Sequence, residues 1–113
     1  MTSTLSYASD ALTRDAIDAL SGVALLEFGT DWCGFCLASA PIIAKALATH
    51  PEVQHIKVED GSGRALGRSF KVKLWPTLIF LDNGKEVARL VRTTDGLAMA
   101  QALATIDPIG SAQ

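Results

Sequence analysis

Hydrophobic and polar residues follow two different spacings along the chain. Apolar residues at helical spacing predict helices at residues 10–21, 34–49 and 95–106. Short apolar runs bounded by turn residues predict strands at residues 23–29, 53–59, 77–81 and 85–92. A weak strand is expected before residue 10, and the glycine-rich segment after residue 59 has room for one short helix. This order predicts an α/β fold in which a mostly parallel sheet with an antiparallel edge has helices on both faces.

Local signals refine three of these elements. The first helix has an apolar stripe expected to face the core, formed by Leu12, Ala16, Ala19 and Leu20. The last helix has a similar stripe, formed by Met99, Leu103 and Ile106. Thr94 or Asp95 can cap the N-terminus of that last helix, because both side chains accept hydrogen bonds from free backbone N–H groups. Asn83-Gly84 between the final two strands predicts a tight hairpin.

Composition narrows the classes of function. The chain has 113 residues, of which 49% are hydrophobic and 19% charged, so we expect a single domain over residues 1–113. The formal net charge of −2 argues against nucleic acid or an anionic membrane as the main partner. We find no apolar run long enough to span a membrane, and no secretory signal in the first ten residues. We therefore expect a cytoplasmic monomer.

The two cysteines of the chain stand close together, between a predicted strand and a predicted helix. Cys36 shares a helical stripe with the apolar residues Ala40, Ile43 and Leu47, so it should face the core. Cys33 lies at the start of the helix, where free N–H groups and the helix dipole favour a thiolate. We expect Cys33 to be exposed and Cys36 to be shielded. This difference suits thiol–disulfide exchange, in which one thiolate attacks and a second thiol resolves the mixed disulfide.

Two other interpretations of the pair are weaker. A structural zinc site needs about four ligands, usually from two such pairs. The sequence has no second pair, and His50 and His55 lack a matching spacing, so no metal is expected. An inert structural pair is unexpected at a helix N-terminus. We therefore favour redox work without a bound cofactor, carried by a redox-active Cys33–Cys36 disulfide.

The motifs around the pair resemble those of the thioredoxin family. They are "LLEFGTDWCGFC", Pro41, "IKVED", "LWPTLIF" and "DNGK", and they recur in the order of the family from about residue 20 to residue 92. The resemblance implies a thioredoxin fold, with a central mixed sheet of strand order 1-3-2-4-5 flanked by helices on both faces. It also implies that Cys33 is the nucleophile, Cys36 the resolving thiol and Pro76 a cis-proline beside them.

Glu27 interrupts an otherwise apolar strand, where an unpaired carboxylate would be costly. The family has an acid at the matching position, normally aspartate, which moves protons for the resolving cysteine. Lys57 matches a family lysine that pairs with this acid across neighbouring strands. We expect Glu27 and Lys57 to support catalysis, the alternative being a purely structural ion pair between them.

Other residues are expected to contact the substrate. The resemblance places Trp32 beside the active site, and implies that Trp75 offers its backbone to a bound peptide by a short strand addition. The alternative for either tryptophan is that it covers the edge of the core. Gly34 and Phe35 separate the cysteines, where classical thioredoxins have Gly-Pro. Arg92 falls where the family commonly keeps a glycine in its docking surface.

Phe35 leads to a prediction about the redox potential of the cysteine pair. Proline at this position would lack an N–H, whereas the Phe35 N–H can point toward the Cys33 sulfur and stabilise its thiolate. A more stable reduced form makes the disulfide a stronger oxidant. We therefore expect this chain to be less reducing than a Gly-Pro thioredoxin, with recognition of partners as the alternative role of Phe35. Leu74, where a glycine is usual, is a further departure from the family.

The resemblance implies a protein-disulfide oxidoreductase, most simply a disulfide reductase. Its partners would be disulfide-containing proteins and an upstream thiol reductase. Two alternatives stay open: a more oxidising thiol oxidase or isomerase, and a non-catalytic adaptor or chaperone built on the same fold.

Overall fold

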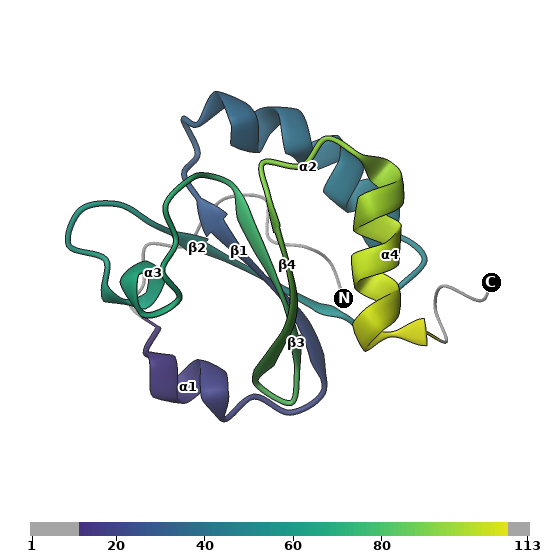
Figure 1. The fold of residues 1–113 in the computed structure, drawn as a ribbon, viewed down its shortest axis with the longest axis horizontal. Coiled ribbons are helices and arrows are strands. Elements are labelled where there is room, and N and C mark those ends of the chain that lie inside the picture. Colours follow the sequence, from purple (N-terminus) through teal and green to yellow (C-terminus); the bar gives the residue numbers. More distant parts are fainter. Residues whose placement is uncertain (1–11, 109–113) are drawn as a thin grey trace.

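The structure is a computed structural model, and it describes residues 12–108. The helices are α1 (Arg14–Asp18), α2 (Gly34–Leu47), α3 (Ala65–Ser69) and α4 (Gly96–Ile106) (Figure 1). The strands are β1 (Val23–Gly29), β2 (Gln54–Glu59), β3 (Thr77–Asp82) and β4 (Lys85–Val91). Every strand and the helices α2 and α4 lie within about two residues of their predicted bounds, and α3 lies in the segment where a short helix was predicted. The weak strand predicted before residue 10 lies outside the described residues.

The four described strands form one mixed sheet in the order β2-β1-β3-β4. This is the expected order 1-3-2-4-5 without its first strand, which lies outside the described residues. β1 pairs with β2 in parallel and with β3 antiparallel, and β3 pairs antiparallel with β4. The expectation of a mostly parallel sheet is therefore wrong for the described strands. Alternating helices and strands do not specify direction, and the connection through the five-residue α3 returns β3 antiparallel to β1.

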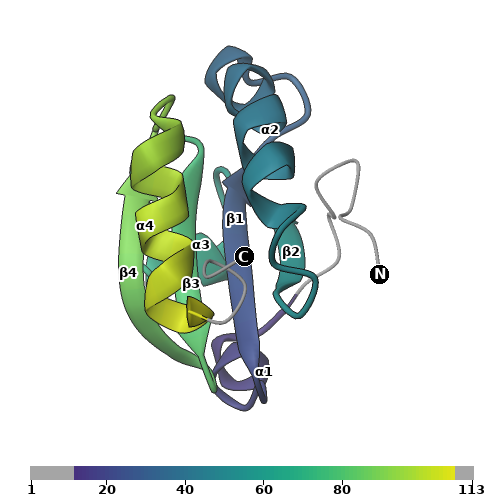
Figure 2. The same ribbon diagram turned by 90° about the vertical axis from the view of Figure 1, so that its right-hand side faces the viewer.

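Helices cover both faces of the sheet, with α2 and α4 on one face and α1 and α3 on the other (Figures 1 and 2). Strand β1 is buried on both sides, as its nearly continuous apolar sequence predicts. Its alternate residues serve different faces: Leu25 packs with Ile43 of α2, whereas Leu26 packs with Leu66 of α3. Glu27 therefore shares the α2 face with Leu25.

Helix α1 differs most from its prediction. It is one short helix of five residues, capped by the Thr13 hydroxyl, which accepts the Ala16 N–H at 3.0 Å. Only Ile17 is buried in it, whereas Leu12 on the predicted inner stripe is exposed. The predicted stripe is wrong for Leu12, Ala16 and Ala19, because so short a helix presents about one residue to the sheet, and that position belongs to a branched aliphatic side chain. Leu20, beyond the end of the helix, is partly buried and packs against the core as predicted. The first two residues of the predicted span lie outside the described part.

Helix α4 agrees with its prediction. The Asp95 carboxylate caps it by accepting the N–H groups of Leu97 and Ala98, at 2.9 and 3.3 Å. The predicted stripe is buried, namely Met99, Leu103 and Ile106. Beyond its end, Asp107 bonds the buried His50 at 2.9 Å, which ties α4 to the connection between α2 and β2.

The hairpin between β3 and β4 provides a stability prediction. Asn83 and Gly84 have positive φ angles of 51° and 81°, and a Cβ on Gly84 would overlap the Asp18 carbonyl at the end of α1. Gly84→Ala should lower the free energy of unfolding by about 1–3 kcal/mol through backbone strain and this overlap. Gly96→Ala is the matched control, because nothing lies within 4 Å of its added Cβ. Equal urea midpoints for both variants would contradict the prediction.

Candidate redox site

Cys33 caps the N-terminus of α2 with its sulfur. Its backbone is extended, with φ −83° and ψ 119°, and its Sγ accepts the Cys36 N–H at 3.1 Å. The cap forms at this place because β1 ends at Gly29 and only a short loop separates it from α2. Both cysteines are free thiols. The Cys33 sulfur therefore receives a backbone donor at the positive end of the helix dipole.

The expected difference in exposure between the two cysteines is not found. Cys33 is 7% exposed and Cys36 is 3% exposed, so the expectation of an exposed Cys33 is wrong. The reason is Trp75, whose side chain packs against both cysteines. The two sulfurs differ in their place on the helix instead, since Cys33 is the cap and Cys36 is the buried residue of the first turn.

The Trp75–Pro76 peptide bond is cis, as the resemblance predicts. The Trp75 ring is held from two sides. Its indole N–H donates to the Asp60 carboxylate at 2.9 Å, and its ring makes an edge contact with Trp32, with 5.7 Å between the ring centres. Trp75 therefore covers the cysteines in one defined position.

Helix α3 supports this arrangement through a glycine. A Cβ on Gly67 would overlap the Asp60 carboxylate, which holds the Trp75 indole. The absence of a side chain at residue 67 thus lets Asp60 lie between α3 and the tryptophan. Sequence analysis singled out neither residue, although the glycine-rich segment and the short helix it predicts are where they occur.

Arg92 follows β4 and contacts two parts of the site, the cis-proline loop and the start of α2. Its φ angle is 53°, and its N–H donates to the Pro76 carbonyl at 2.9 Å. Its Nε–H donates to the Trp75 carbonyl at 2.9 Å, and its guanidinium carbon lies 4.0 Å from the centre of the Phe35 ring. The residue that departs from the family glycine therefore contacts both the cis-proline loop and the dipeptide between the cysteines.

The expected role of the Phe35 N–H is wrong in the described structure. The hydrogen bond that the Cys33 sulfur accepts from the first turn comes from Cys36, not from Phe35. A capping side chain commonly bonds the N–H three residues along the helix, and this donor does not depend on what occupies residue 35. The redox argument based on Phe35 therefore loses its stated cause. The Phe35 ring instead is 54% exposed and stacks under Arg92.

Glu27 and Lys57 lie opposite each other on neighbouring strands, as the resemblance predicts. The Glu27 side chain is buried, and its Oε1 lies 2.7 Å from Nε2 of His55, which is also buried. Sequence reasoning missed His55, which it considered only as a metal ligand. The signal was the spacing, because His55 lies two residues before Lys57 and so shares its face of β2. Glu27 thus belongs to a buried cluster on the face of the sheet covered by α2.

The remaining predicted residues surround the pair on the surface. Trp32 is 74% exposed, Leu74 is exposed, and Gly34 is the exposed first residue of α2. Among residues 12–108 no group of three or more His, Cys, Asp or Glu residues could hold a metal ion. No helix in the same span is long and apolar enough to cross a membrane.

Comparisons with known proteins agree with this geometry. A sequence model of the family described as Thioredoxin matches residues 6–105. This chain belongs to the thioredoxin family. The thioredoxin of Chlamydia trachomatis is 36% identical over 75 residues, which are 66% of this chain and 74% of that protein. Thioredoxin-1 of Saccharomyces cerevisiae is 31% identical over 90 residues, 80% of this chain and 86% of that protein.

A solved thioredoxin supports the same assignment. The structure of thioredoxin 2 from Pseudomonas aeruginosa PAO1 in its reduced form is 51% identical. It aligns with a TM-score of 0.81 over 89% of this chain and 94% of that one. Membership of the thioredoxin family supports thiol–disulfide oxidoreductase activity, and proteins of this family act on disulfide substrates together with reductases.

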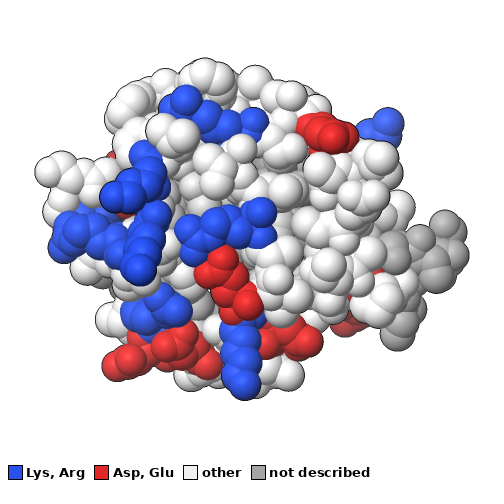
Figure 3. Space-filling model, in the orientation of Figure 1, with Lys and Arg blue, Asp and Glu red and all other residues white. Residues whose placement is uncertain are grey.

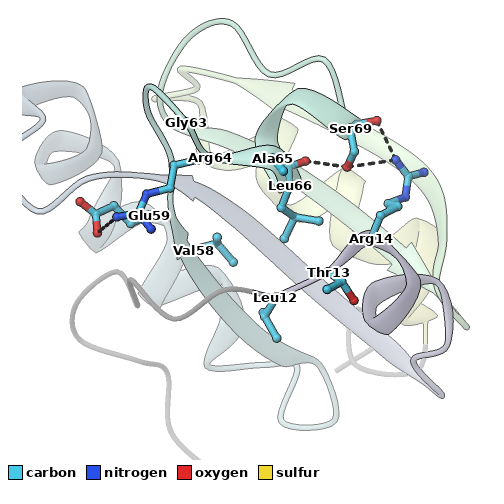
Figure 4. A pocket seen from close by; sticks show the side chains of 10 residues that line it. All are labelled: Leu12, Thr13, Arg14, Val58, Glu59, Gly63, Arg64, Ala65, Leu66 and Ser69. Carbon is cyan, nitrogen blue, oxygen red and sulfur yellow. Dashed lines mark hydrogen bonds and ion pairs between the residues drawn. The ribbon is translucent and has the colours of Figure 1, made fainter.

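A separate pocket of about 380 Å³ lies among α1, β2 and α3 (Figure 4). Its lining includes Leu12, Val58 and Leu66, and Arg64 at its rim pairs with Glu59 at 3.1 Å. None of the residues predicted for the thioredoxin site lines it. The pocket is therefore distinct from the redox pair.

Charged side chains are unevenly distributed on the face in Figure 3. Lys and Arg gather over α3 and the segments beside it, whereas the surface over α4 is mostly uncharged. The basic residues of that part of the chain are Arg64, Arg68, Lys71 and Lys73. Acidic side chains lie close below them, so this face has no continuous field of one sign.

The arrangement around Trp75 leads to a labelling prediction. Iodoacetamide should modify Cys33 faster than Cys36, because the Cys33 sulfur receives the capping N–H at the helix terminus. Trp75→Ala should raise the Cys33 rate several-fold by removing its cover. Val87→Ala is the control, since it removes an exposed apolar side chain from β4. Rates can be followed by peptide mass spectrometry, and equal rates for the two cysteines would contradict the assigned asymmetry.

Proposed function

We propose that this protein is a protein-disulfide reductase in which Cys33 attacks and Cys36 resolves. The observation that carries the proposal is the Cys33 sulfur, which caps α2 and accepts the Cys36 N–H beside the cis Trp75–Pro76 bond. Family membership supports the general class of reaction. No bound cofactor or metal is required, because the electrons are stored in the Cys33–Cys36 thiol pair.

The reaction has two exchange steps. The Cys33 thiolate attacks one sulfur of a partner's disulfide, so a mixed disulfide forms and the other partner sulfur leaves as a thiolate that takes up a proton. Cys36 then loses its proton and attacks the Cys33 sulfur, which forms the Cys33–Cys36 disulfide and releases the second partner thiolate. The partner gains two electrons and this chain loses two. An upstream thiol reductase returns them.

Glu27 accepts the Cys36 proton in this scheme. Its side chain lies on the face of the sheet that α2 covers, and Cys36 is the buried residue in the first turn of α2. His55 Nε2 faces the Glu27 carboxylate at 2.7 Å, so it must carry a proton when the carboxylate is ionised. His55 Nδ1 is buried without a hydrogen-bond partner among the described residues, and a second proton there would leave an unbonded N–H.

A neutral His55 that donates to an ionised Glu27 follows from these contacts. This state leaves Glu27 able to take one proton while its other neighbours stay in place. Lys57 stands opposite Glu27 in the strand register. Lys57 and His55 thus act on the reaction through Glu27, and are positioning residues in this scheme.

The proposal is tested by reduction of a disulfide protein such as insulin, with a small dithiol as the electron donor. Cys36→Ser should trap mixed disulfides with that substrate, whereas Cys33→Ser should trap none. A non-catalytic adaptor would show no turnover. The disulfide of an oxidase or isomerase would instead be reduced to the thiols by a glutathione buffer poised at cytoplasmic potential, which would overturn the assignment as a reductase.

The same reasoning suggests where and how the protein works. A reductase depends on a supply of thiol reductant, so we infer a reducing compartment such as the cytoplasm. The proposed reaction needs only one copy of the site, and a monomer is sufficient for it.

Glu27→Gln should lower turnover by about tenfold to a hundredfold, as expected when a positioned proton acceptor is lost. The amide keeps an oxygen toward His55, so the fold should remain, as shown by circular dichroism. Glu52→Gln makes the same chemical change at an exposed loop position and should leave turnover unchanged. His55→Gln should shift the pH profile of turnover. If Glu27→Gln kept full turnover from neutral to alkaline pH, Glu27 would have a structural role only.

A further inference from the structure

The Arg92 side chain is held in a fixed position at the mouth of the redox site. Its Nε–H is bonded to the Trp75 carbonyl, and the Phe35 ring covers one face of the guanidinium. The hydrogen bond described for this side chain uses only Nε, which leaves the two terminal nitrogens with their N–H groups. Two parallel N–H groups on a planar guanidinium are the geometry that binds a carboxylate with two hydrogen bonds.

Within residues 12–108, no carboxylate is paired with that group. The ion pairs among residues 12–108 do not include Arg92. The nearest acid in the sequence, Asp95, is used to cap α4. The exposed Phe35 ring in contact with Arg92 is uncharged, and Trp32 and Leu74 are further exposed apolar side chains on the segments that flank the cysteines and the cis-proline. Arg92 therefore places a positive charge without a paired carboxylate against the exposed Phe35 ring and the cis-proline loop.

We propose that Arg92 selects protein substrates that carry an aspartate or glutamate close to the disulfide under attack. The proposal rests on the reductase function proposed above and names the chemistry of the partner segment. The partner's carboxylate binds the two terminal nitrogens of Arg92 while its disulfide reaches Cys33. Charge complementarity favours an acidic segment, because Arg92 attracts a carboxylate of the partner and repels a basic side chain.

The contact with Trp75 is compatible with this docking. A carbonyl oxygen accepts two hydrogen bonds, and Arg92 uses one acceptor position on Trp75. A partner backbone that bonds the other position leaves Arg92 in place and brings neighbouring side chains within its reach. The fixed guanidinium loses little conformational freedom on binding, which strengthens a pair that would otherwise be weak at an exposed site.

The test uses synthetic disulfide-bonded peptides that differ only in charge. A set of peptides carries one glutamate at each of the three positions on either side of the attacked cysteine, and a matched set carries glutamine. The ratio of kcat/KM for glutamate over glutamine should reach about fivefold at one or more positions, and it should fall with added salt. Equal values at all positions would overturn the proposal while leaving the reductase function intact.

Variants separate recognition from other roles of Arg92. Arg92→Gln should bring the ratio to one, and Arg92→Lys should keep only part of it, because lysine has the charge without the two parallel donors. Arg89→Gln removes the same charge from β4, where the arginine is bonded to Glu86, and should keep the ratio. Phe35→Ala should lower the ratio by releasing the guanidinium.

Two results would show that the proposal is wrong. If Arg92→Gln raised the rates for both peptide sets equally, Arg92 would block access to the Trp75 carbonyl and would not select substrates by charge. If Arg89→Gln lowered the ratio as much as Arg92→Gln, overall charge would explain the preference. Absence of reduction for every peptide and for insulin would overturn the reductase function itself, and the inference with it.

Discussion

The site depends on one interaction, the hydrogen bond from the Cys36 N–H to the Cys33 sulfur. Most helix N-termini are capped by oxygen, whereas here the cap is also the reacting atom. The bond forms because β1 is anchored on both faces and ends four residues before the cysteine. The rest of the sheet and α2 hold that anchor. One hydrogen bond therefore both caps the helix and contacts the sulfur that reacts.

The cis-proline loop completes the site by covering the cysteine pair that begins α2. Trp75 closes over both cysteines, and its position is determined by contacts with Asp60, Trp32 and Arg92. These partners come from the end of β2, the loop before α2 and the end of β4. An exposure of only 7% at Cys33 means that access to the nucleophile depends on the movement of one aromatic ring. The helix end donates a hydrogen bond to the sulfur, and the tryptophan regulates contact with it.

Most of the fold could be predicted from periodicity, because its helices and strands bury continuous faces. The bounds of β1 and the buried stripe of α4 are read directly from their apolar spacing. The direction of β3 could not be read in this way, since it depends on how residues 60–76 return the chain. The predicted buried side of α1 was wrong for a related reason. Its alanines have the spacing of an apolar stripe, but the packing of Ile17 decides which side is buried.

The residues of the site likewise divide into those predictable from local motifs and those that depend on distant segments. The cysteine pair and the cis Trp75–Pro76 bond follow from motifs local in sequence. The exposure of Cys33 and the partner of Glu27 depend on side chains that arrive from distant segments. His55 was missed because its role exists only once β2 lies beside β1. Arg92 was recognised as a departure from the family, but its contact with Phe35 needed the geometry of two loops.

The glycine in α3 links mutational effects across the molecule. Gly67, Asp60 and Trp75 form a stack in which the space left by the first admits the second, and the second holds the third. Substitutions at residues 67 and 75 should therefore not be additive, because each acts on the same carboxylate. A double-mutant cycle between them would report a coupling energy although their side chains share no bond. A side chain larger than hydrogen at residue 67 of α3 would therefore disturb the redox centre, although α3 takes no part in the chemistry.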